Sequence, residues 1–455
     1  MDMQTKIDPA WAWQPYQPDE SQPWDEGLAA HLYRRAGFGA DSKMLHAAVK
    51  RDPSEVVDNL ILRNSQPNEF RSAADGLTDT ILATGNPKRL SAAWVYRLLQ
   101  TPSQLLEKMT LFWHGHFATS ADKVKDPSMM WDQNKLLRHH ALGDFSALVQ
   151  SIACDPAMLV YLDSAINRKA HPNENFAREL MELFCLGEGN YSEQDVQQLA
   201  RCFTGWEIKN KKFRKNRYQQ DVDEKTILGQ RGRFDGEEGV QVVLKQPSLE
   251  VFLAKKLCRF FVADSLEPSD KLLQPLAELF RGSNLQIAPV VKMMLSSNLF
   301  FSSHAVGQKI RSPVELVIGA LRCLQATTNS QLVADGLLKA GQGLFYPPNV
   351  KGWDGGRSWI NSSTLLERSN LVSRILENDA TRFGGLSLDH FLQSQQVNSV
   401  HSAIDYFERL LLAVRLDDSV KSLLYESVAS GTQKPDRKYR ALLRAFLSLP
   451  QCQIG

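Results

Sequence analysis

The sequence predicts an all-α fold, a multi-helical globular bundle with one small β-hairpin or irregular insertion. Apolar residues recur at intervals of three and four along most of the chain, as they do on one face of an α-helix. The insertion breaks this period with glycines and short strand-like runs. We therefore divide the chain into an extended arm (1–27), a helical half (28–206), the insertion (207–245) and a second helical half (246–455).

The composition is that of an ordinary soluble globular protein. Hydrophobic residues make up 43% and charged residues 23%, and the net charge of +2 gives no general reason to expect nucleic-acid or membrane binding. The six cysteines are scattered without a CxxC pair, which favours reduced thiols over a disulfide framework or a zinc ribbon. The sequence shows no secretory leader and no long apolar run, so we expect a cytoplasmic location.

The chain begins with a segment rich in proline, tryptophan and acidic residues, which we expect to pack across the domain as an extended arm. A helix follows in LAAHLYRRAGFGA and ends at its glycines. Arg34 and Arg35 lie on this helix. Each is either a surface residue or a buried partner for acids elsewhere in the chain.

Two histidines lie close together in LFWHGHFATS. On a regular helix, His114 and His116 point about 200° apart and do not bind one ion together. A helix end at Gly115 would let the rings converge. Both a structural role through ring hydrogen bonds and metal ligation are consistent with this spacing.

The stretch from Pro172 to Trp206 is the most distinctive in the chain. Its first helix is amphipathic, ends at Gly187 and is followed by a helix that Ser192 caps. The polar face carries Glu174, Asn175, Arg178, Glu179 and Glu182. This face is either a solvated surface with ion pairs four residues apart or a buried polar site for a hard cation or for acid/base chemistry. His171, in the loop before the helix, is placed to reach such a site.

Two later segments also have distinctive compositions. The basic run Lys209 to Arg217 with interleaved aromatics is either a solvated loop or a contact for phosphates and RNA bases. The loop 341–366 is dense in glycine, proline and aromatic residues. Its candidate substrate-binding residues are Phe345, Asn349, Lys351, Trp353 and Trp359. The aromatic rings either stack on a sugar or peptide or fill the core.

Several of these segments together resemble a known family. HLYRRAGFGA, LFWHGHFATS, DPAMLVYLD, the central stretch, KLCRFFV and GQGLFYPPNVKGWDGG are similar to the bacterial family catalogued as domain of unknown function 1800. The resemblance implies a helical architecture and a partner from a neighbouring gene that looks similar to sulfatases and alkaline phosphatases. Many relatives have histidine where this chain has Phe184, and a His-Asp pair where it has Gln220-Asp221.

We derive two main functional hypotheses. In the first, the protein is an enzyme that acts on an anionic or carbohydrate-type substrate, and Arg178 orients the anionic group. Its divalent metal ion would be bound by residues from the set Glu174, Glu179, Glu182, His114, His116 and His171. In the second, it is a non-catalytic protein that binds the sulfatase-like partner and uses the polar helix as an ion-pair network.

Overall fold

The computed structural model describes residues 7–63, 66–264, 266–429 and 434–455. These residues form 25 α-helices and three two-stranded antiparallel sheets, which confirms the predicted all-α class. The first nine helices are α1 (Pro9–Ala12), α2 (Glu26–Ala36), α3 (Ser42–Ala48), α4 (Pro53–Leu62), α5 (Asn68–Ala83), α6 (Leu90–Gln100), α7 (Gln104–His116), α8 (Ala121–Val124) and α9 (Pro127–His139).

The middle of the chain holds the central stretch and two hairpins. Its elements are α10 (Phe145–Ala153), α11 (Pro156–Tyr161), α12 (Asn175–Glu179), a π-helix (Leu180–Cys185), α13 (Glu193–Cys202), β1 (Trp206–Lys209), β2 (Lys212–Lys215), β3 (Lys225–Ile227), β4 (Gln230–Gly232) and α14 (Gly236–Leu244). Strands β1 and β2 pair, as do β3 and β4. The expectation of an irregular segment as far as residue 245 was wrong at its end, because Asp235 and Glu238 form a capping box that starts α14.

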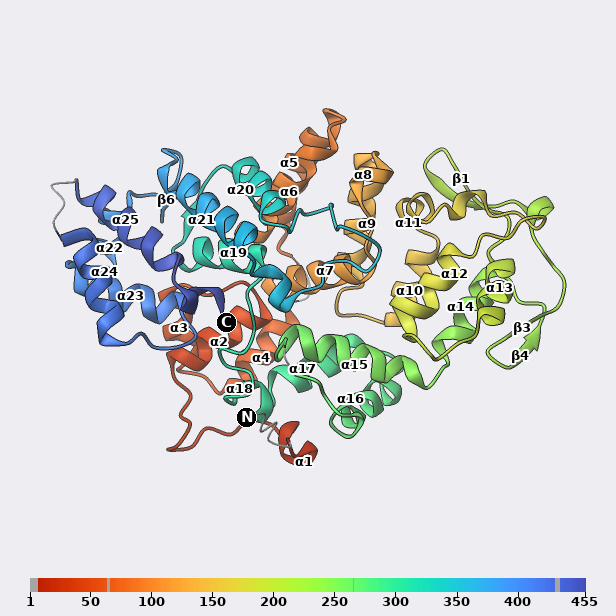
Figure 1. Cartoon of the computed structure of the whole chain (residues 1–455), viewed down its shortest axis with the longest axis horizontal. Helices are drawn as coiled ribbons and strands as arrows, with labels where there is room; N and C mark the ends of the chain where they lie inside the picture. The colour runs from red at the N-terminus through yellow and green to blue at the C-terminus, as the bar shows by residue number, and fades with distance from the viewer. Residues whose placement is uncertain (1–6, 64–65, 265, 430–433) are drawn as a thin grey trace.

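The remaining elements complete the helical body. They are α15 (Ser248–Phe261), α16 (Asp270–Gly282), α17 (Ile287–Leu295), α18 (Asn298–Phe301), α19 (Pro313–Cys323), β5 (Ala326–Thr327), α20 (Ser330–Lys339), α21 (Ser362–Glu377), β6 (Arg382–Phe383), α22 (Leu388–Ser394), α23 (Val400–Leu411), α24 (Asp418–Ala429) and α25 (Pro435–Leu447). Figure 1 shows α22 to α25 at one end of the long axis, α10 to α14 with the hairpins at the other, and α7 between them.

Helix α7 is the centre of the fold. Every side chain on it is buried, and only Gly115, which has none, is partly exposed. A helix surrounded by protein on all sides places its polar residues in the interior, where they need partners. Glu107, for example, accepts two hydrogen bonds from Arg138 and one from Trp94. The polar residues at the other end of α7 form part of the site described below.

The N-terminal arm packs across the body as predicted, although its first six residues lie outside the described part of the chain. Trp13 donates its indole N–H to the carbonyl oxygen of Leu272, and Tyr16 N–H donates to that of Ser296. In the described part of the chain, no helix is both long and apolar enough to span a bilayer. The six cysteines are unpaired thiols.

Candidate functional site

The two histidines of α7 face different surroundings. Helix α7 continues through His116, so the rings diverge as on a regular helix. His114 is buried against the rings of Trp94 and Phe345, and its Nε2 accepts the backbone N–H of Phe345 at 3.2 Å. Burial lowers the pKa of His114 to about 3, so the ring is neutral at physiological pH. This histidine fixes the position of the 341–366 loop.

The ring of His116 is held between α15 and the π-helix. Its Nε2 lies 3.0 Å from the carbonyl oxygen of Phe184, and its Nδ1 lies 3.2 Å from Nζ of Lys256. The carbonyl can only accept, so Nε2 carries the proton and Nδ1 accepts from Lys256. Burial and the nearby lysine hold the pKa of His116 well below its ordinary value. Both ring nitrogens are therefore engaged.

The π-helix explains how the central stretch reaches this position. The C-terminal carbonyls of a helix have no partner within the helix, and a π-helical turn changes where they point. Here the carbonyl oxygen of Leu183 accepts from Lys256 at 2.8 Å, and that of Phe184 accepts from His116. Backbone carbonyl groups of the central stretch, rather than its acidic side chains, thus position His116 and Lys256, which both line the cavity described below.

The predicted acidic face lies on the other side of this helix. Arg178 binds both carboxylate oxygens of Glu193 at 2.7 Å and Glu174 at 3.2 Å, at a partly exposed position. Glu182 accepts from the hydroxyl of Tyr191 at 2.8 Å. Burial and the neighbouring Glu182 raise the pKa of Glu179. Arg178, Glu174 and Glu182 thus take part in ion pairs and hydrogen bonds at partly exposed positions.

A cavity of about 260 Å³ lies between α7, α15, the start of α19 and the 341–366 loop. Its charged lining residues are Lys256, Arg259, Asp264, Lys309, Glu315, Lys351 and Asp354. His116, Phe260, Trp353 and Trp359 supply ring surfaces. Aromatic walls combined with a few convergent charges are typical of small-molecule sites.

The floor of the cavity is a buried cluster of two lysines around one carboxylate. Glu315 Oε1 lies 2.5 Å from Nζ of Lys108 and 3.2 Å from Nζ of Lys309. The two lysines lower the pKa of Glu315 strongly despite its burial, so this carboxylate is ionised. Burial lowers the pKa of Lys108 to about 8. Glu315 also accepts the backbone N–H of Ser312, which completes the capping box of α19.

The loop forms the roof because its glycines allow close packing on α7. Gly352 has φ +81°, and a Cβ there would lie 2.1 Å from the carbonyl oxygen of Gly115. Only glycine fits such an approach. The side chain of Trp353 then lies against Gly115 and is 5.6 Å, centroid to centroid, from the ring of His114. The indole N–H of Trp353 is buried and has no hydrogen-bond partner among the described residues.

The cavity is lined by four cationic and three acidic side chains. Lys309 is paired with Glu315, and Arg259 with Glu267 at 2.5 Å. Within the described residues, neither Lys256 nor Lys351 has a carboxylate within 4 Å of its Nζ. Lys256 and the exposed Lys351 are thus lining cations without an ion pair in the described part of the chain, in a partly open cavity that Asp264 and Asp354 also line.

The side chains proposed as metal ligands do not fit a metal ion. Across the residues that the structure describes, no three His, Cys, Asp or Glu side chains are grouped to hold one. His114 and His116 are hydrogen-bonded to different partners, and His171 is exposed in its loop. Glu182 faces Tyr191 rather than either α7 histidine. Metal binding stays a prediction with no grouped set of ligands to support it.

The comparison with protein families gives a full-length match. The family model described as protein of unknown function (DUF1800) matches residues 31–454. The chain belongs to this family. No curated protein and no solved structure matches it. The resemblance noted from the sequence motifs is confirmed. In this DUF1800 protein three of those motifs line the cavity: LFWHGHFATS and KLCRFFV supply two of its walls, and GQGLFYPPNVKGWDGG supplies the roof.

The predicted substrate-binding residues divide between the cavity and the core. Lys351, Trp353 and Trp359 line the cavity of the DUF1800 protein. Phe345 is fully buried against Trp94 and His114, so it fills the core instead. Asn349 is exposed, and its side chain accepts the backbone N–H of Lys351, which shapes the turn of the loop.

Sequence reasoning missed the charged residues of the cavity. Lys256 and Arg259 lie in KLCRFFV, which contributed to the resemblance but not to any site prediction. Glu315 was recognised only as part of a helix start. Arg35 is buried and donates to the carbonyl oxygens of Val262 and Ala305, and not to the central acids. The signal available in the sequence was an acid and a lysine, Glu107 and Lys108, within the largely apolar run that forms α7.

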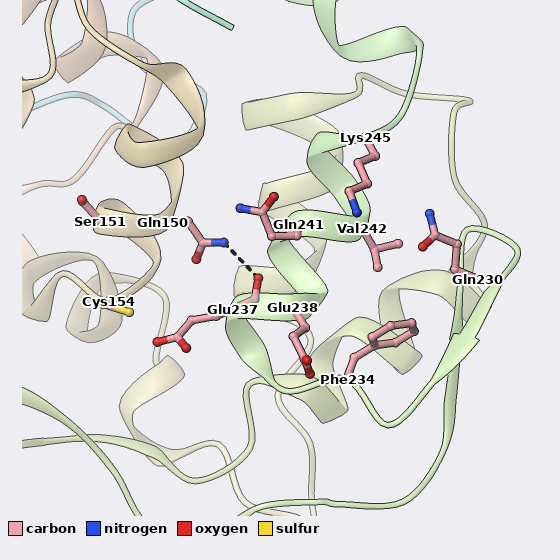
Figure 2. Close-up of a pocket in the computed structure, with 10 residues that line it drawn as sticks. All are labelled: Gln150, Ser151, Cys154, Gln230, Phe234, Glu237, Glu238, Gln241, Val242 and Lys245. Carbon is pink, nitrogen blue, oxygen red and sulfur yellow. Dashed lines mark hydrogen bonds between the residues drawn. The ribbon is translucent and has the colours of Figure 1, made fainter. Parts of the chain in front are cut away.

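A second, wider groove of about 680 Å³ lies between α10, α14 and the β3–β4 hairpin (Figure 2). Its lining is mostly amides and acids, and Gln150 donates to the carbonyl oxygen of Glu237 at 2.9 Å. Burial and Glu237 raise the pKa of Cys154 to about 12, so its thiol is not a nucleophile at neutral pH. We therefore place the candidate site in the central cavity.

Three of the six basic residues from Lys209 to Arg217 form ion pairs within the protein. Lys211 lies 2.7 Å from Asp126, Lys215 lies 2.9 Å from Glu237, and Arg214 binds Glu207. These ion pairs reduce the positive charge that this run presents to an RNA phosphate. RNA binding stays a prediction with less support than the cavity has.

Proposed function

We propose that this protein binds a small anionic molecule with a sugar-like body in the central cavity. The observation that carries the proposal is the presence in one cavity with tryptophan walls of two lysines, Lys256 and Lys351, that have no carboxylate within 4 Å of Nζ among the described residues. A phosphate or sulfate ester provides acceptor oxygens for the N–H groups of these lysines that have no acceptor within the protein. The indole faces provide flat surface for a sugar ring.

The size and electrostatics of the cavity support a small ligand. Its volume of about 260 Å³ is just below the range of roughly 300–1,000 Å³ that drug-sized ligands occupy. A monosaccharide ester is therefore a better match than an oligosaccharide. Lys256 is half-buried, and hydrogen bonds between charged groups are worth about 1.5–3 kcal/mol each. Loss of its ammonium group is expected to weaken binding roughly 10- to 100-fold.

Calorimetric titration with glucose 6-phosphate, glucose 6-sulfate and glucose tests the proposal. We expect the two esters to bind and uncharged glucose to bind far more weakly. The variant Lys256→Met keeps the aliphatic stem and removes the charge, so it should show the predicted loss of affinity. Lys255→Met is the matched control, because Lys255 is the neighbouring residue on α15 and lies 3.7 Å from Glu267 outside the cavity.

Two results would contradict the proposal. One is equal affinity for glucose and for its esters, which would show that the cations of the cavity do not contribute. The other is an equal loss of affinity in Lys255→Met and Lys256→Met, which would place the anion on the surface of α15.

The predictions of a metal-dependent reaction and of a sulfatase-like partner come from the sequence and from the resemblance. Neither is needed for anion binding. Co-expression followed by size-exclusion chromatography tests the partner: we expect the two chains to elute together if the partner prediction is correct, and separately if it is wrong.

A further inference from the structure

Lys256 differs from the other lysines around the cavity in its hydrogen bonds. Its Nζ donates to the carbonyl oxygen of Leu183 at 2.8 Å and to Nδ1 of His116 at 3.2 Å. Both acceptors are uncharged. Lys108 and Lys309, in contrast, are both paired with the carboxylate of Glu315, which stabilises their ammonium forms.

Two acceptors match the two N–H groups of a neutral amine. With both hydrogens donated, the nitrogen lone pair is directed away from Leu183 and His116. The Lys256 side chain lines the cavity, so a group bound there can meet that lone pair. Burial lowers the pKa of Lys256 to about 8, although the ring of Phe252, 4.7 Å from Nζ, favours the charged form. At pH 7 roughly a tenth of the molecules then carry the neutral amine.

We propose that Lys256 is a nucleophilic amine that forms an imine with an anionic aldehyde or ketone bound in the cavity. This inference rests on the proposed function, because the anionic group of the ligand is what places its carbonyl carbon beside Lys256. Lysines desolvated in a pocket are a type that forms such adducts.

The reaction balances without any further reactant. The lone pair of Nζ attacks the carbonyl carbon, and the C=O π electrons move to oxygen to give a carbinolamine. The two hydrogens of the amine leave with that oxygen as water, and a C=N bond remains. One solvent proton converts the imine to its cationic form. Lys351, which also lines the cavity, is available to hold the phosphate or carboxylate group of the ligand.

Borohydride trapping of the wild-type protein tests this inference. The probe is glyceraldehyde 3-phosphate, and its matched control is glycerol 3-phosphate, which has the same phosphate but no carbonyl group. Borohydride delivers a hydride to the imine carbon and makes the adduct permanent, so peptide mass spectrometry locates it. We expect the adduct at Lys256 and not at the adjacent Lys255, which lies outside the cavity beside Glu267. Excess glycerol 3-phosphate should suppress it.

The outcomes separate the two proposals. An adduct confined to Lys256 and blocked by glycerol 3-phosphate supports both. Adducts spread over exposed lysines at similar rates overturn the imine inference. Calorimetric binding of glycerol 3-phosphate without any adduct overturns the imine inference and leaves the anion site intact. Absence of both binding and adduct overturns both proposals.

A variant provides a second readout. Lys256→Arg keeps a positive charge at this position but has no nucleophilic amine. We expect it to give no adduct in the cavity under conditions that trap the wild type. Trapping of an adduct at Lys309 or Lys351 in this variant, at the wild-type rate, would show that Lys256 is not the reactive amine.

Discussion

Replacing Glu315 by glutamine tests the buried charge cluster beneath the cavity. Glutamine has nearly the same volume and can still cap α19, so the change removes the negative charge and little else. Lys108 and Lys309 then lose the one carboxylate that lies within 4 Å of either of them in the described part of the chain. Breaking a buried ion pair by removing one partner costs about 3–5 kcal/mol. We expect Glu315→Gln to lower the free energy of unfolding by this amount.

Equilibrium urea denaturation at several pH values is the assay. The pKa of Glu315 is lower in the folded protein than its ordinary value of 4.5, so its stabilisation is fully present above pH 4.5. It is lost as the pH falls below that value, because the unfolded state then binds the proton first. The stability difference between the wild type and Glu315→Gln should therefore be largest near neutral pH and smaller in acid.

A double variant checks the assignment of this cost to the lysines. Lys108→Met in the Glu315→Gln background removes one of the two unpaired ammonium groups, so we expect it to restore at least about 1 kcal/mol. The reasoning is refuted if Glu315→Gln unfolds within about 0.5 kcal/mol of the wild type, or if the two substitutions destabilise additively.

Three further predictions follow from other contacts. Gly352→Ala should destabilise the protein and weaken sugar-ester binding, because its Cβ would lie 2.1 Å from the carbonyl oxygen of Gly115. Gly115→Ala should fold normally, because the nearest atom to its Cβ outside its own helix is 3.6 Å away. Thermal melting and calorimetry compare the two variants. Burial raises the pKa of Asp155 to about 7 from 3.8, so its stabilisation is present below about pH 4 and lost as the pH rises through 7. The wild type should thus lose up to about 4 kcal/mol relative to Asp155→Asn between pH 4 and pH 7 in denaturant titrations, and a constant difference would contradict this. Elemental analysis should find the same metal content in the wild type and in a Glu179→Ala, Glu182→Ala double variant, because these carboxylates have no grouped co-ligands among the described residues; a stoichiometric metal lost in the variant would restore the metal-site hypothesis.

Local sequence signals determined much of the secondary structure. The capping boxes at Ser192 and Ser312 start helices as their spacing predicts. Side chain and backbone satisfy each other within one turn there, so the information is contained in four neighbouring residues. The density of glycine and proline in residues 341–366 likewise predicted a loop.

The sequence also showed that one face of the central helix is polar, but it did not show what surrounds that face. A helical wheel gives the direction of each side chain around the axis, and it does not show whether a protein neighbour or solvent lies there. In the tertiary structure the carboxylate of Glu174 pairs with Arg178, and that of Glu182 accepts a hydrogen bond from Tyr191. The tertiary structure also converts residues 180–185 into a π-helix, whose carbonyls hold His116 and Lys256.

The cavity itself was decided only by tertiary structure. Its walls come from residues 111–116, 256–264, 309–315 and 342–359, which are separated by up to about half the chain. No local pattern encodes the distance between such segments, because the packing of the intervening helices sets it. The sequence by itself determined which residues can carry charge and where helices begin. Folding determined which of those charges are paired and which, like Lys256, face the cavity without an acid.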